Sequence, residues 1–405
     1  MRLAVVSPFL DRQHGTELCI IEQIERFASQ HNWEIHLYSQ RVQDVPGLLP
    51  APRLGENSPG SIFWHMVSAL PGPHLLRYLW WFAANQLRRK RDRASRELRP
   101  EIVYSPGINC LDADVIVVHI VFHEFYRRVK SELTFRTLPL KSWPRAIHRR
   151  LYYKLIMSLE RKIYADPSVR LVAVSHLLAK HLESHFGRTD VTVIPDAVDT
   201  ERFSESTRIA RKSASRQSFH FAEDEFVLLL IGNDWKNKGL GALLKACALL
   251  TDLPLRLLVV GSDDPIFFQP LIEKLRMQDR LRFEAPSSDV LSFYAAADLY
   301  VGPSLEDSFG LPILEAMACG LPVIASAHAG ASELVRDGET GFILRDPQDH
   351  LQLAQLIRRI YADQTLRLAV GQAASRYALG NCSWDENAER TKKLLEDTLE
   401  RLPES

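Results

Sequence analysis

Two carboxylates of this 405-residue chain lie beside a glycine-containing turn and have chemistry suited to a hydroxyl-rich, anionic substrate. Asp307 precedes a glycine-containing turn, and Glu315 follows after seven residues, inside a helix expected over about 312–319. Backbone N–H groups at a helix start bind anions, and a nearby carboxylate can accept hydrogen bonds from sugar hydroxyls. A diphosphate and a polyol in one pocket suggest a nucleotide-sugar as ligand.

Short apolar strands that alternate with helical stretches position these residues. Continuous β-branched runs separated by helices predict parallel sheets covered on both faces, here as an α/β chain with two Rossmann-like, doubly wound domains. The expected strands are 3–7, 34–38, 102–105, 115–119, 171–174 and 191–194 in the first half, and 226–231, 256–260, 281–284, 299–301, 322–325 and 341–344 in the second.

The length is too great for one typical core, so two domains are expected. The net charge is zero, but residues 1–200 carry +7 and the remainder −7, which indicates a basic surface on the first domain. A polar, basic, serine-rich stretch suggests a linker. The predicted parts are residues 1–195, a linker at 196–219, a second domain at 220–383 and a last helix at 384–405.

The acidic segment 303–324 resembles the signature of the family 4 glycosyltransferases, which reads Glu, seven residues, Glu, with Phe-Gly-Leu-Pro inside. These are retaining enzymes of the GT-B fold, with two Rossmann-like domains facing a central cleft. Asp307 stands at the position of the first Glu. The resemblance covers the second half almost throughout and the first half patchily, and it implies that the last helix packs back on the first domain.

Two further segments carry the resemblance. Residues 191–203 resemble the family's interdomain segment, and residues 228–239 resemble its phosphate strand and loop, with Lys238 kept and Asn233 where Arg is common. The resemblance implies that Glu315 holds the ribose and that Lys238 neutralises the diphosphate. It also implies that the donor contacts Asn233, Asp307, Ser308, Phe309, Gly310 and Leu311.

In the first half, Gly15 and Thr16 open a helix after the first strand, a pattern that fits either a plain turn or a phosphate loop. Beside the other motifs it resembles the family's donor-phosphate loop. The resemblance also implies that His119 contacts the donor sugar near the anomeric carbon, in a site completed when the cleft closes. A structural core histidine is the plainer alternative, and His123 is the second choice for the role.

The resemblance to GT-B enzymes implies that no metal is needed, and no other cofactor is expected, since the nucleotide-sugar is itself a substrate. Asp112 and Asp114 form an Asp-x-Asp pair, but they precede a buried strand and lack the context of a metal site. Five scattered cysteines indicate a reduced, cytoplasmic compartment. We expect no signal peptide and no apolar run near the roughly 20 residues that span a bilayer.

The stretch 74–93 mixes aromatic residues, including Trp80 and Trp81, with a basic cluster. It fits either a helix on an anionic membrane surface or, as we prefer, a core helix that ends in a solvated basic turn. Binding of nucleic acid through Arg88–Arg93 is not expected, since no recognition motif accompanies the cluster.

The sequence therefore predicts a retaining glycosyltransferase. The donor would be a UDP- or GDP-sugar, and the acceptor a hydroxyl of a glycan or a lipid-linked molecule. The protein would be cytoplasmic, with peripheral contact at the inner membrane surface as an option. Two alternatives stay open: a GT-B nucleotide-sugar epimerase or phosphorylase, and a catalytically silent nucleotide-sugar-binding protein.

Overall fold

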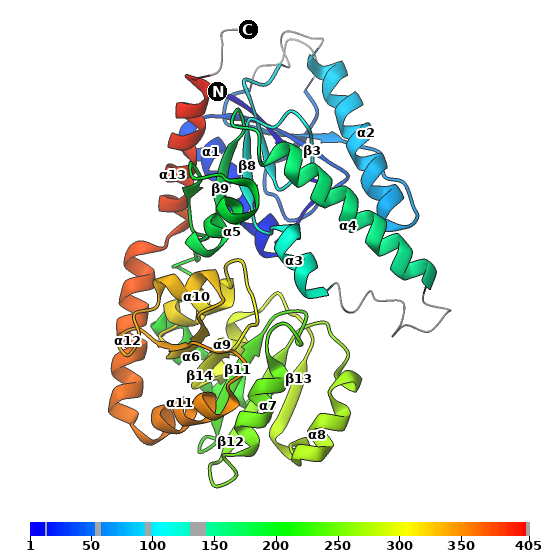
Figure 1. Ribbon diagram of the computed structural model, residues 1–405. Coiled ribbons are helices and arrows are strands. Elements are labelled where there is room, and N and C mark those ends of the chain that lie inside the picture. Colours follow the sequence, from blue (N-terminus) through cyan, green and yellow to red (C-terminus); the bar gives the residue numbers. More distant parts are fainter. Residues whose placement is uncertain (13, 53–57, 94–98, 130–142, 402–405) are drawn as a thin grey trace. The chain divides into compact units, whose positions relative to one another are not determined.

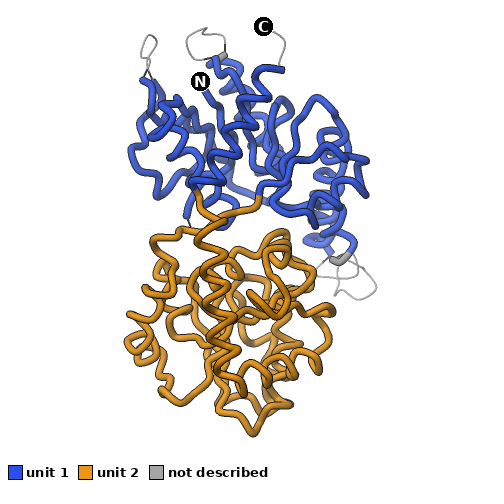
Figure 2. The backbone as a smooth tube through the Cα atoms, turned by 90° about the vertical axis from the view of Figure 1, so that its left-hand side faces the viewer, with its two compact units in different colours: residues 1–194, 385–405 blue, residues 195–384 orange. Residues whose placement is uncertain are grey.

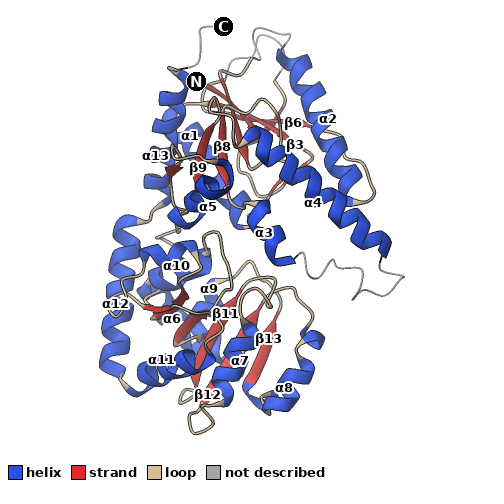
Figure 3. Cartoon of the chain, viewed as in Figure 1, coloured by secondary structure: helices blue, strands red, loops and turns tan. Residues whose placement is uncertain are grey.

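The computed structural model divides into two compact units, Met1–Ile194 with Asp385–Ser405, and Pro195–Trp384 (Figures 1 and 2). Each unit is built on its own parallel sheet with helices on both sides (Figure 3). The structure describes residues 1–12, 14–52, 58–93, 99–129 and 143–401.

The main sheet of the first unit has eight parallel strands in the order β10-β9-β8-β7-β1-β3-β6-β5. Its strands are β1 (Arg2–Val6), β3 (Glu34–Ser39), β5 (Leu48–Pro50), β6 (Ile62–Met66), β7 (Ile102–Pro106), β8 (Val115–Val118), β9 (Arg170–Ala173) and β10 (Thr192–Val193). A separate parallel pair joins β2 (Phe9–Leu10) and β4 (Arg41–Val42). The helices are α1 (Gly15–His31), α2 (His74–Arg93), α3 (Phe122–Val129), α4 (Trp143–Ile163), α5 (His176–Phe186) and α13 (Trp384–Leu399).

The strand order reverses beside β1, which pairs with β3 on one side and with β7 on the other. In open parallel sheets, ligands bind beyond the carboxyl ends of the strands at such a point. The ends of β1 and β7 are therefore the place in this unit where a ligand is expected.

Strand β6 was not expected from the sequence. It contains His65, which is buried and lies between His36 of β3 and Asp92 of α2, with both nitrogen-to-partner distances at 2.8 Å. The other nitrogen of His36 lies 2.8 Å from Glu34. A histidine looks polar in a sequence pattern, but long-range partners allow its burial here.

The sheet of the second unit has six parallel strands in the order β13-β12-β11-β14-β15-β16, and all six were expected. Its strands are β11 (Phe226–Ile231), β12 (Leu255–Val260), β13 (Leu281–Glu284), β14 (Leu299–Gly302), β15 (Val323–Ser326) and β16 (Phe342–Leu344). The α-helices are α6 (Glu205–Ser218), α7 (Leu240–Ala248), α8 (Gln269–Leu275), α9 (Leu291–Ala296), α10 (Leu311–Ala318), α11 (His350–Ala362) and α12 (Gln364–Asn381), and the short 3₁₀ turns are η3 (Pro265–Phe267), η4 (Gln278–Arg280) and η5 (Gly330–Leu334).

The predicted linker at 196–219 differs from the structure, because most of it is the helix α6 of the second unit. Two arginines that suggested a solvated segment are buried. Arg208 donates to the carbonyl of Cys319 at 2.6 Å, and Arg216 pairs with Asp298. A local signal was available, since Ser204 and Thr207 form a capping box at the start of α6.

Helix α13 belongs to the first unit from Asp385 onward. Gln23 of α1 donates to Asn387 at 2.8 Å inside that unit, so residues far apart in sequence share one core. All five cysteines are described and buried, and no disulfide joins any of them. Among the described residues, no helix is long and apolar enough to cross a membrane.

Candidate functional site

Lys238 and Asp307 meet in the second unit, beside the point where its strand order reverses. Lys238 follows β11 and Asp307 follows β14, and these two strands are neighbours in the sheet. The ammonium of Lys238 forms an ion pair with Oδ2 of Asp307, and both side chains are about four-fifths buried. A cation and a carboxylate that the sequence places 69 positions apart thus share one site.

Two glycines make room for this pair. Gly232 has φ of +140°, and a Cβ there would lie 2.7 Å from Cε of Lys238. Gly310 has φ of +92°, in the region that L side chains rarely adopt, and a Cβ there would lie 3.3 Å from Oδ2 of Asp307. Both glycines are therefore needed for the backbone to pass so close to the ion pair.

Backbone hydrogen bonds hold the loop that carries Asp307. The N–H of Leu305 donates to the carbonyl of Asn237 at 2.7 Å, and the Asn237 side chain donates to the carbonyl of Glu306 at 2.8 Å. The N–H of Asp307 donates to the carbonyl of His328 at 2.9 Å. The acidic loop is thus tied to its neighbours on both sides, which keeps Asp307 in place without a ligand.

The turn from Ser308 to Leu311 leads into α10. Ser308 is half-buried, whereas Phe309 is buried and its carbonyl accepts from Ala331 at 2.6 Å. Gly310 caps α10 and Leu311 is its first residue. The first N–H groups of a helix lack partners within the helix and carry partial positive charge, so this end of α10 can receive an anionic group.

Glu315 lies on α10, one turn further along, and is 9% exposed. Its Oε2 accepts from the hydroxyl of Tyr294 at 2.5 Å. Burial raises the pKa of Glu315, while the Tyr294 hydrogen bond and the charge of Arg202 act in the opposite direction. Sequence reasoning missed Tyr294, since nothing in the spacing of α9 points to a partner 21 positions away.

Asn233 is exposed at the end of β11. Its Oδ1 accepts from the N–H of Ser262 at 3.0 Å and from the Ser262 hydroxyl at 2.8 Å. The side chain thus holds the loop after β12.

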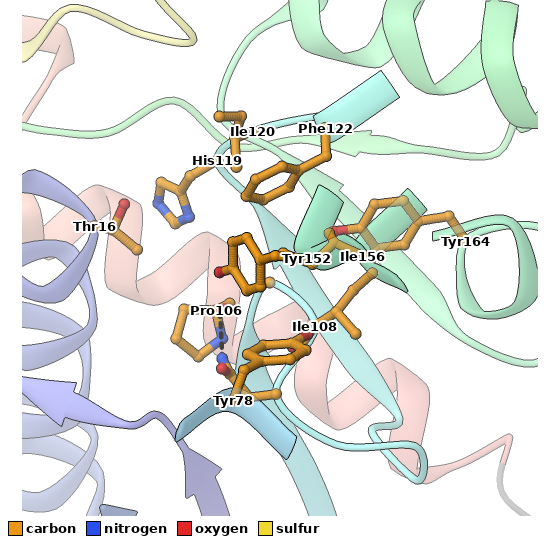
Figure 4. Close-up of a pocket in the computed structure, with 12 residues that line it drawn as sticks. Thr16, Tyr78, Pro106, Ile108, His119, Ile120, Phe122, Tyr152, Ile156 and Tyr164 are labelled. Atoms are coloured by element: carbon orange, nitrogen blue, oxygen red, sulfur yellow. Dashed lines mark hydrogen bonds between the residues drawn. The ribbon is translucent and has the colours of Figure 1, made fainter. Parts of the chain in front are cut away.

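In the first unit, Thr16 and His119 line one pocket of about 190 Å³ (Figure 4). Thr16 belongs to the first turn of α1, and His119 follows the last residue of β8. Gly15 lies just before Thr16, faces open space and has no positive φ, so its backbone could be approached by a ligand. The pocket also includes Pro106, at the carboxyl end of β7, where the strand order predicts a ligand.

Glu17 is a residue that the sequence reasoning did not single out for its side chain. Burial raises the pKa of its carboxyl, and the charges of His119 and His14 act against that rise. The carboxylate of Glu17 on α1 therefore lies close enough to His119, which follows β8, for their charges to interact. Only the packing of α1 on the sheet reveals this.

His123, the second choice beside His119, does not line the pocket. Its Nδ1 lies 2.6 Å from Oε2 of the fully buried Glu160, which also accepts the N–H groups of Phe122 and His123 at 2.6 and 3.1 Å. Burial raises the pKa of Glu160 to about 7 and lowers the pKa of His123. Glu160 therefore caps the start of α3 and supports the turn that follows His119.

The Asp-x-Asp pair has structural partners. Asp112 accepts two hydrogen bonds from the buried guanidinium of Arg89, at 2.5 and 2.9 Å. Asp114 accepts from the N–H of Val103 at 2.7 Å. Both carboxylates thus hold elements of the first unit together.

Two family models match this chain. Residues 14–202 match the model described as Glycosyltransferase Family 4, and residues 211–377 match the one described as Glycosyl transferases group 1. The chain is a member of the family 4 glycosyltransferases. The predicted resemblance is thereby confirmed, including the half of the chain where the motifs were patchy.

Relatives within family 4 include a D-inositol 3-phosphate glycosyltransferase of Geodermatophilus obscurus, 37% identical over 57% of this chain and 52% of the relative. Another is the lipopolysaccharide glucosyltransferase WaaG of Escherichia coli, 32% identical over 46% of this chain and 49% of the relative. The chain thus spans about half the length of the curated relatives that it matches.

Solved structures of similar fold cover nearly the whole chain. A crystal structure of WaaG has a TM-score of 0.76 at 20% identity and covers 97% of this chain and 99% of that one. Anabaena HepE in complex with UDP-glucose has a TM-score of 0.68 at 19% identity and covers 98% and 100%. The GT-B fold with two parallel-sheet domains is therefore confirmed.

Proposed function

We propose that this protein is a retaining glycosyltransferase that moves a sugar from a nucleoside-diphosphate sugar to a hydroxyl of a glycan or lipid-linked acceptor. The observation that supports this most directly is the Lys238–Asp307 pair beside the start of α10, with Glu315 one turn away. These residues place a cation, helix N–H groups and two carboxylates at one end of a parallel sheet.

Each group has a defined task in this proposal. Lys238 and the start of α10 stabilise the negative charge that the diphosphate gains when the bond to the sugar carbon breaks. Asp307 orients the Lys238 ammonium and accepts hydrogen bonds from sugar hydroxyls, and Glu315 does the same for the ribose. The acceptor oxygen bonds to the sugar carbon as the bond from that carbon to the diphosphate breaks, and the acceptor hydroxyl gives its proton to the departing diphosphate.

The first unit contributes Gly15, Thr16 and His119 to donor binding in this proposal. Thr16 and His119 share a pocket wall, which fits a common ligand. The variant His119→Ala tests the assignment: transfer should fall while binding of the free nucleotide stays the same.

A uridine nucleotide is the first donor to test, because a neighbour of this fold was solved with UDP-glucose. A thermal-shift screen with UDP, GDP, ADP and CDP, with and without sugars, identifies the base. Ligand at about 100 times its Kd adds roughly 2.7 kcal/mol to the stability of the folded state. A shift lost in Glu315→Ala supports the site, whereas no shift with any nucleotide contradicts it.

Product analysis separates the enzyme classes. Retention requires that the anomeric configuration of the product, read by proton NMR, match that of the donor. Isomerised donor formed without acceptor would instead indicate an epimerase, and phosphorolysis of a glycan would indicate a phosphorylase. Donor binding with no turnover on a broad acceptor panel would indicate a silent binding protein.

We further propose that the first unit touches an anionic membrane surface through α2 and α4, which pack against each other (Figure 1). Trp81 is 2% exposed and belongs to the core, so of the two tryptophans only Trp80 can reach a membrane. An exposed apolar row on α2 runs through Leu76, Leu79, Trp80 and Leu87, and a second row on α4 runs through Trp143, Ile147 and Leu151.

The charges on these two described helices favour an anionic partner. Their single acidic residues, Asp92 and Glu160, are both buried. The exposed charged side chains are all basic, namely Arg77, Lys90, Arg91, Arg145, Arg149, Lys154, Arg161 and Lys162. Apolar side chains flanked by cations are typical of surfaces that lie in a membrane interface.

Cosedimentation with vesicles that contain roughly 30% phosphatidylglycerol tests this contact. Binding should weaken with salt and should fall in the double variant Trp80→Ser, Ile147→Ser. A matched control is Leu249→Ser, which removes an equally exposed apolar side chain from the second unit. Binding that is absent, or equal in both variants, would contradict the proposal.

A further inference from the structure

Trp235 anchors the loop that carries Lys238 in the core of the second unit. This loop joins β11 to α7, and Trp235 comes three positions before Lys238 in it. Trp235 is 1% exposed and is the largest fully buried side chain in the described part of the chain. Lys238, by contrast, forms its ion pair with Asp307 in the candidate site. One short loop therefore has one residue in the core and one charged residue in the site.

Aromatic packing fixes the indole of Trp235. Its ring centroid lies 5.0 Å from that of Phe283 on β13 and 6.5 Å from that of Phe268, which precedes α8. Offset or tilted rings at such distances attract each other. Nε1 of Trp235 has no hydrogen-bond partner among the described residues, although buried polar groups usually have one. The indole thus acts here through its shape and volume rather than through a polar contact.

Gly261 gives the indole room to reach β13. Strand β12 lies between β11 and β13 in the sheet, and Gly261 directly follows its last residue. A Cβ at Gly261 would lie 2.5 Å from Nε1 of Trp235 and 2.4 Å from the carbonyl oxygen of Gly232. Because both distances are too short for any real Cβ, the indole and Gly232 are packed directly against Gly261.

Gly232 connects this packing to Lys238. A Cβ at Gly232 would lie 2.7 Å from Cε of Lys238, so the lysine stem lies against Gly232, whose carbonyl lies against Gly261. The N–H of Leu240 also donates to the carbonyl of Trp235 at 3.0 Å, which closes the loop around Lys238. The position of the lysine stem therefore depends on the indole through both side-chain packing and the backbone.

We propose that Trp235 is a positioning residue for Lys238: its buried ring, packed against Gly261, holds the Lys238 ammonium where the diphosphate of the donor binds. The proposal rests on the function given to Lys238 above. A charge stabilises a developing anion best when it is already in place, and a displacement of about 1 Å can lower a rate about 10²-fold. A lysine stem is flexible, so its position requires support from the residues packed against it.

The first measurement is the preference for a diphosphate over a monophosphate, because Lys238 is assigned to the diphosphate. Calorimetric titration of the full chain with UDP and UMP, and with GDP and GMP, gives the ratio of the two affinities. Trp235→Leu should lose most of this preference, as should Lys238→Ala, whereas Trp235→Phe, which keeps an aromatic ring, should retain most of it. Gly261→Ala adds the Cβ that meets the indole and should act like Trp235→Leu.

Two control variants separate positioning from stability. Phe342→Leu removes a large buried ring of β16 from the same core. Gly241→Ala adds a Cβ in α7 at a place where the nearest atom, on Leu271, is 4.0 Å away. Both controls should keep the diphosphate preference of the unaltered protein, even if Phe342→Leu lowers the melting temperature as much as Trp235→Leu.

Transfer rates with saturating donor give the second measurement. The rate should fall about 10–10²-fold in Trp235→Leu and should change about twofold or less in Phe342→Leu. The proposal is overturned if Trp235→Leu keeps the diphosphate preference that Lys238→Ala loses, or if Phe342→Leu loses the preference to the same extent.

Failure of this inference can be told apart from failure of the proposed function. A diphosphate preference that is unaffected by Trp235→Leu would reject the positioning role alone. Absence of any nucleotide binding to the unaltered protein would contradict the transferase function, and urea unfolding without ligand would then test the positioning. The shift in the urea midpoint of the double variant Trp235→Leu, Lys238→Met should differ from the sum of the single shifts, because residues that share contacts are coupled. Additive shifts would overturn the proposal.

Discussion

The sites of the two units differ in which elements supply their residues and in how polar those residues are. In the second unit, Lys238, Asp307, Gly310 and Glu315 come from two loops and one short helix beside neighbouring strands, and polar contacts hold them. In the first unit, the pocket collects side chains from α1, α2, α4 and the ends of β7 and β8, and most of its wall is apolar.

This difference explains why one half of the chain is easy to interpret. A site formed by contiguous loops leaves its residue types in a fixed order, which a motif captures. An apolar pocket formed by distant elements can be built from many residue combinations, because hydrophobic packing is not directional. The second site is therefore conspicuous in the sequence, and the first becomes visible only after folding.

The largest expected effect tests the polar site. Lys238→Ala should lower the transfer rate by about 10²–10³, since a fixed charge that stabilises a departing anion contributes this much in comparable sites. The control is Lys236→Ala, in the same loop but exposed. With saturating donor, the transfer rate of Lys238→Ala should be far lower than that of Lys236→Ala. Equal rates would show that Lys238 does not stabilise the departing diphosphate.

The next prediction concerns the support of the first unit and its pH dependence. Burial raises the pKa of Glu160 to about 7, from 4.5, so the protonated carboxyl is favoured in the folded state. Its contribution to stability is fully present below about pH 4.5 and is lost as the pH rises through 7. Relative to Glu160→Gln, the unaltered protein should therefore lose about 3 kcal/mol between pH 4.5 and 8.

Urea unfolding of both proteins across this range measures that slope. Asp385→Asn is the control: hydrogen bonding to Arg26 lowers the pKa of Asp385 below 3.8, so its own loss of stability occurs at more acidic pH. Above pH 5, the stability of Asp385→Asn should change with pH in the same way as that of the unaltered protein. A stability difference for Glu160→Gln that stays constant with pH would show that Glu160 does not titrate there.

A smaller effect separates two glycines, one from each unit. Gly310→Ala should destabilise the protein by about 1–2 kcal/mol, because φ of +92° is unfavourable for any residue with a Cβ. Gly15→Ala should change stability by about 0.5 kcal/mol or less, since its surroundings are open and its φ is not positive. Thermal unfolding measures both, and equal losses would contradict the strain assigned to Gly310.

An effect similar in size to that of Gly310→Ala concerns Tyr294, whose hydroxyl donates to Glu315. Tyr294→Phe should cost about 1–2 kcal/mol in stability, because the buried carboxyl loses a partner. Loss of this hydrogen bond should also raise the pKa of Glu315 further. Nucleotide binding should weaken more in Tyr294→Phe than in Tyr300→Phe, which alters a buried tyrosine of strand β14. Unchanged nucleotide affinity would exclude Tyr294 from positioning Glu315.

The sequence predicted the strands of the second unit better than those of the first. Every strand of the second sheet was expected, because most of these strands are continuous apolar runs that lie buried in the sheet. Strand β6 was missed, since the polarity of His65 hides a buried position that Asp92 satisfies from α2. Helix α6 was taken for a linker because the burial of Arg208 and Arg216 depends on partners about 80 to 110 positions away.

What the sequence determines by itself is local. The glycines at 232 and 310, the capping box at Ser204 and the order of residues around Asp307 act through backbone conformation and hydrogen bonds over a few positions. Their effects can be worked out without knowing the rest of the chain. That is why the family and the polar half of the site follow from the sequence.

Tertiary structure decided the rest. The Lys238–Asp307 ion pair, the cap that Glu160 places on α3 and the position of Tyr152 beside His119 all join residues at least 30 positions apart. Such contacts depend on which buried surfaces pack together, and many sequences satisfy the same packing. The physical reason is that a partner supplied by a distant element leaves no local pattern in the sequence, whereas a turn or a helix cap acts through residues only a few positions apart.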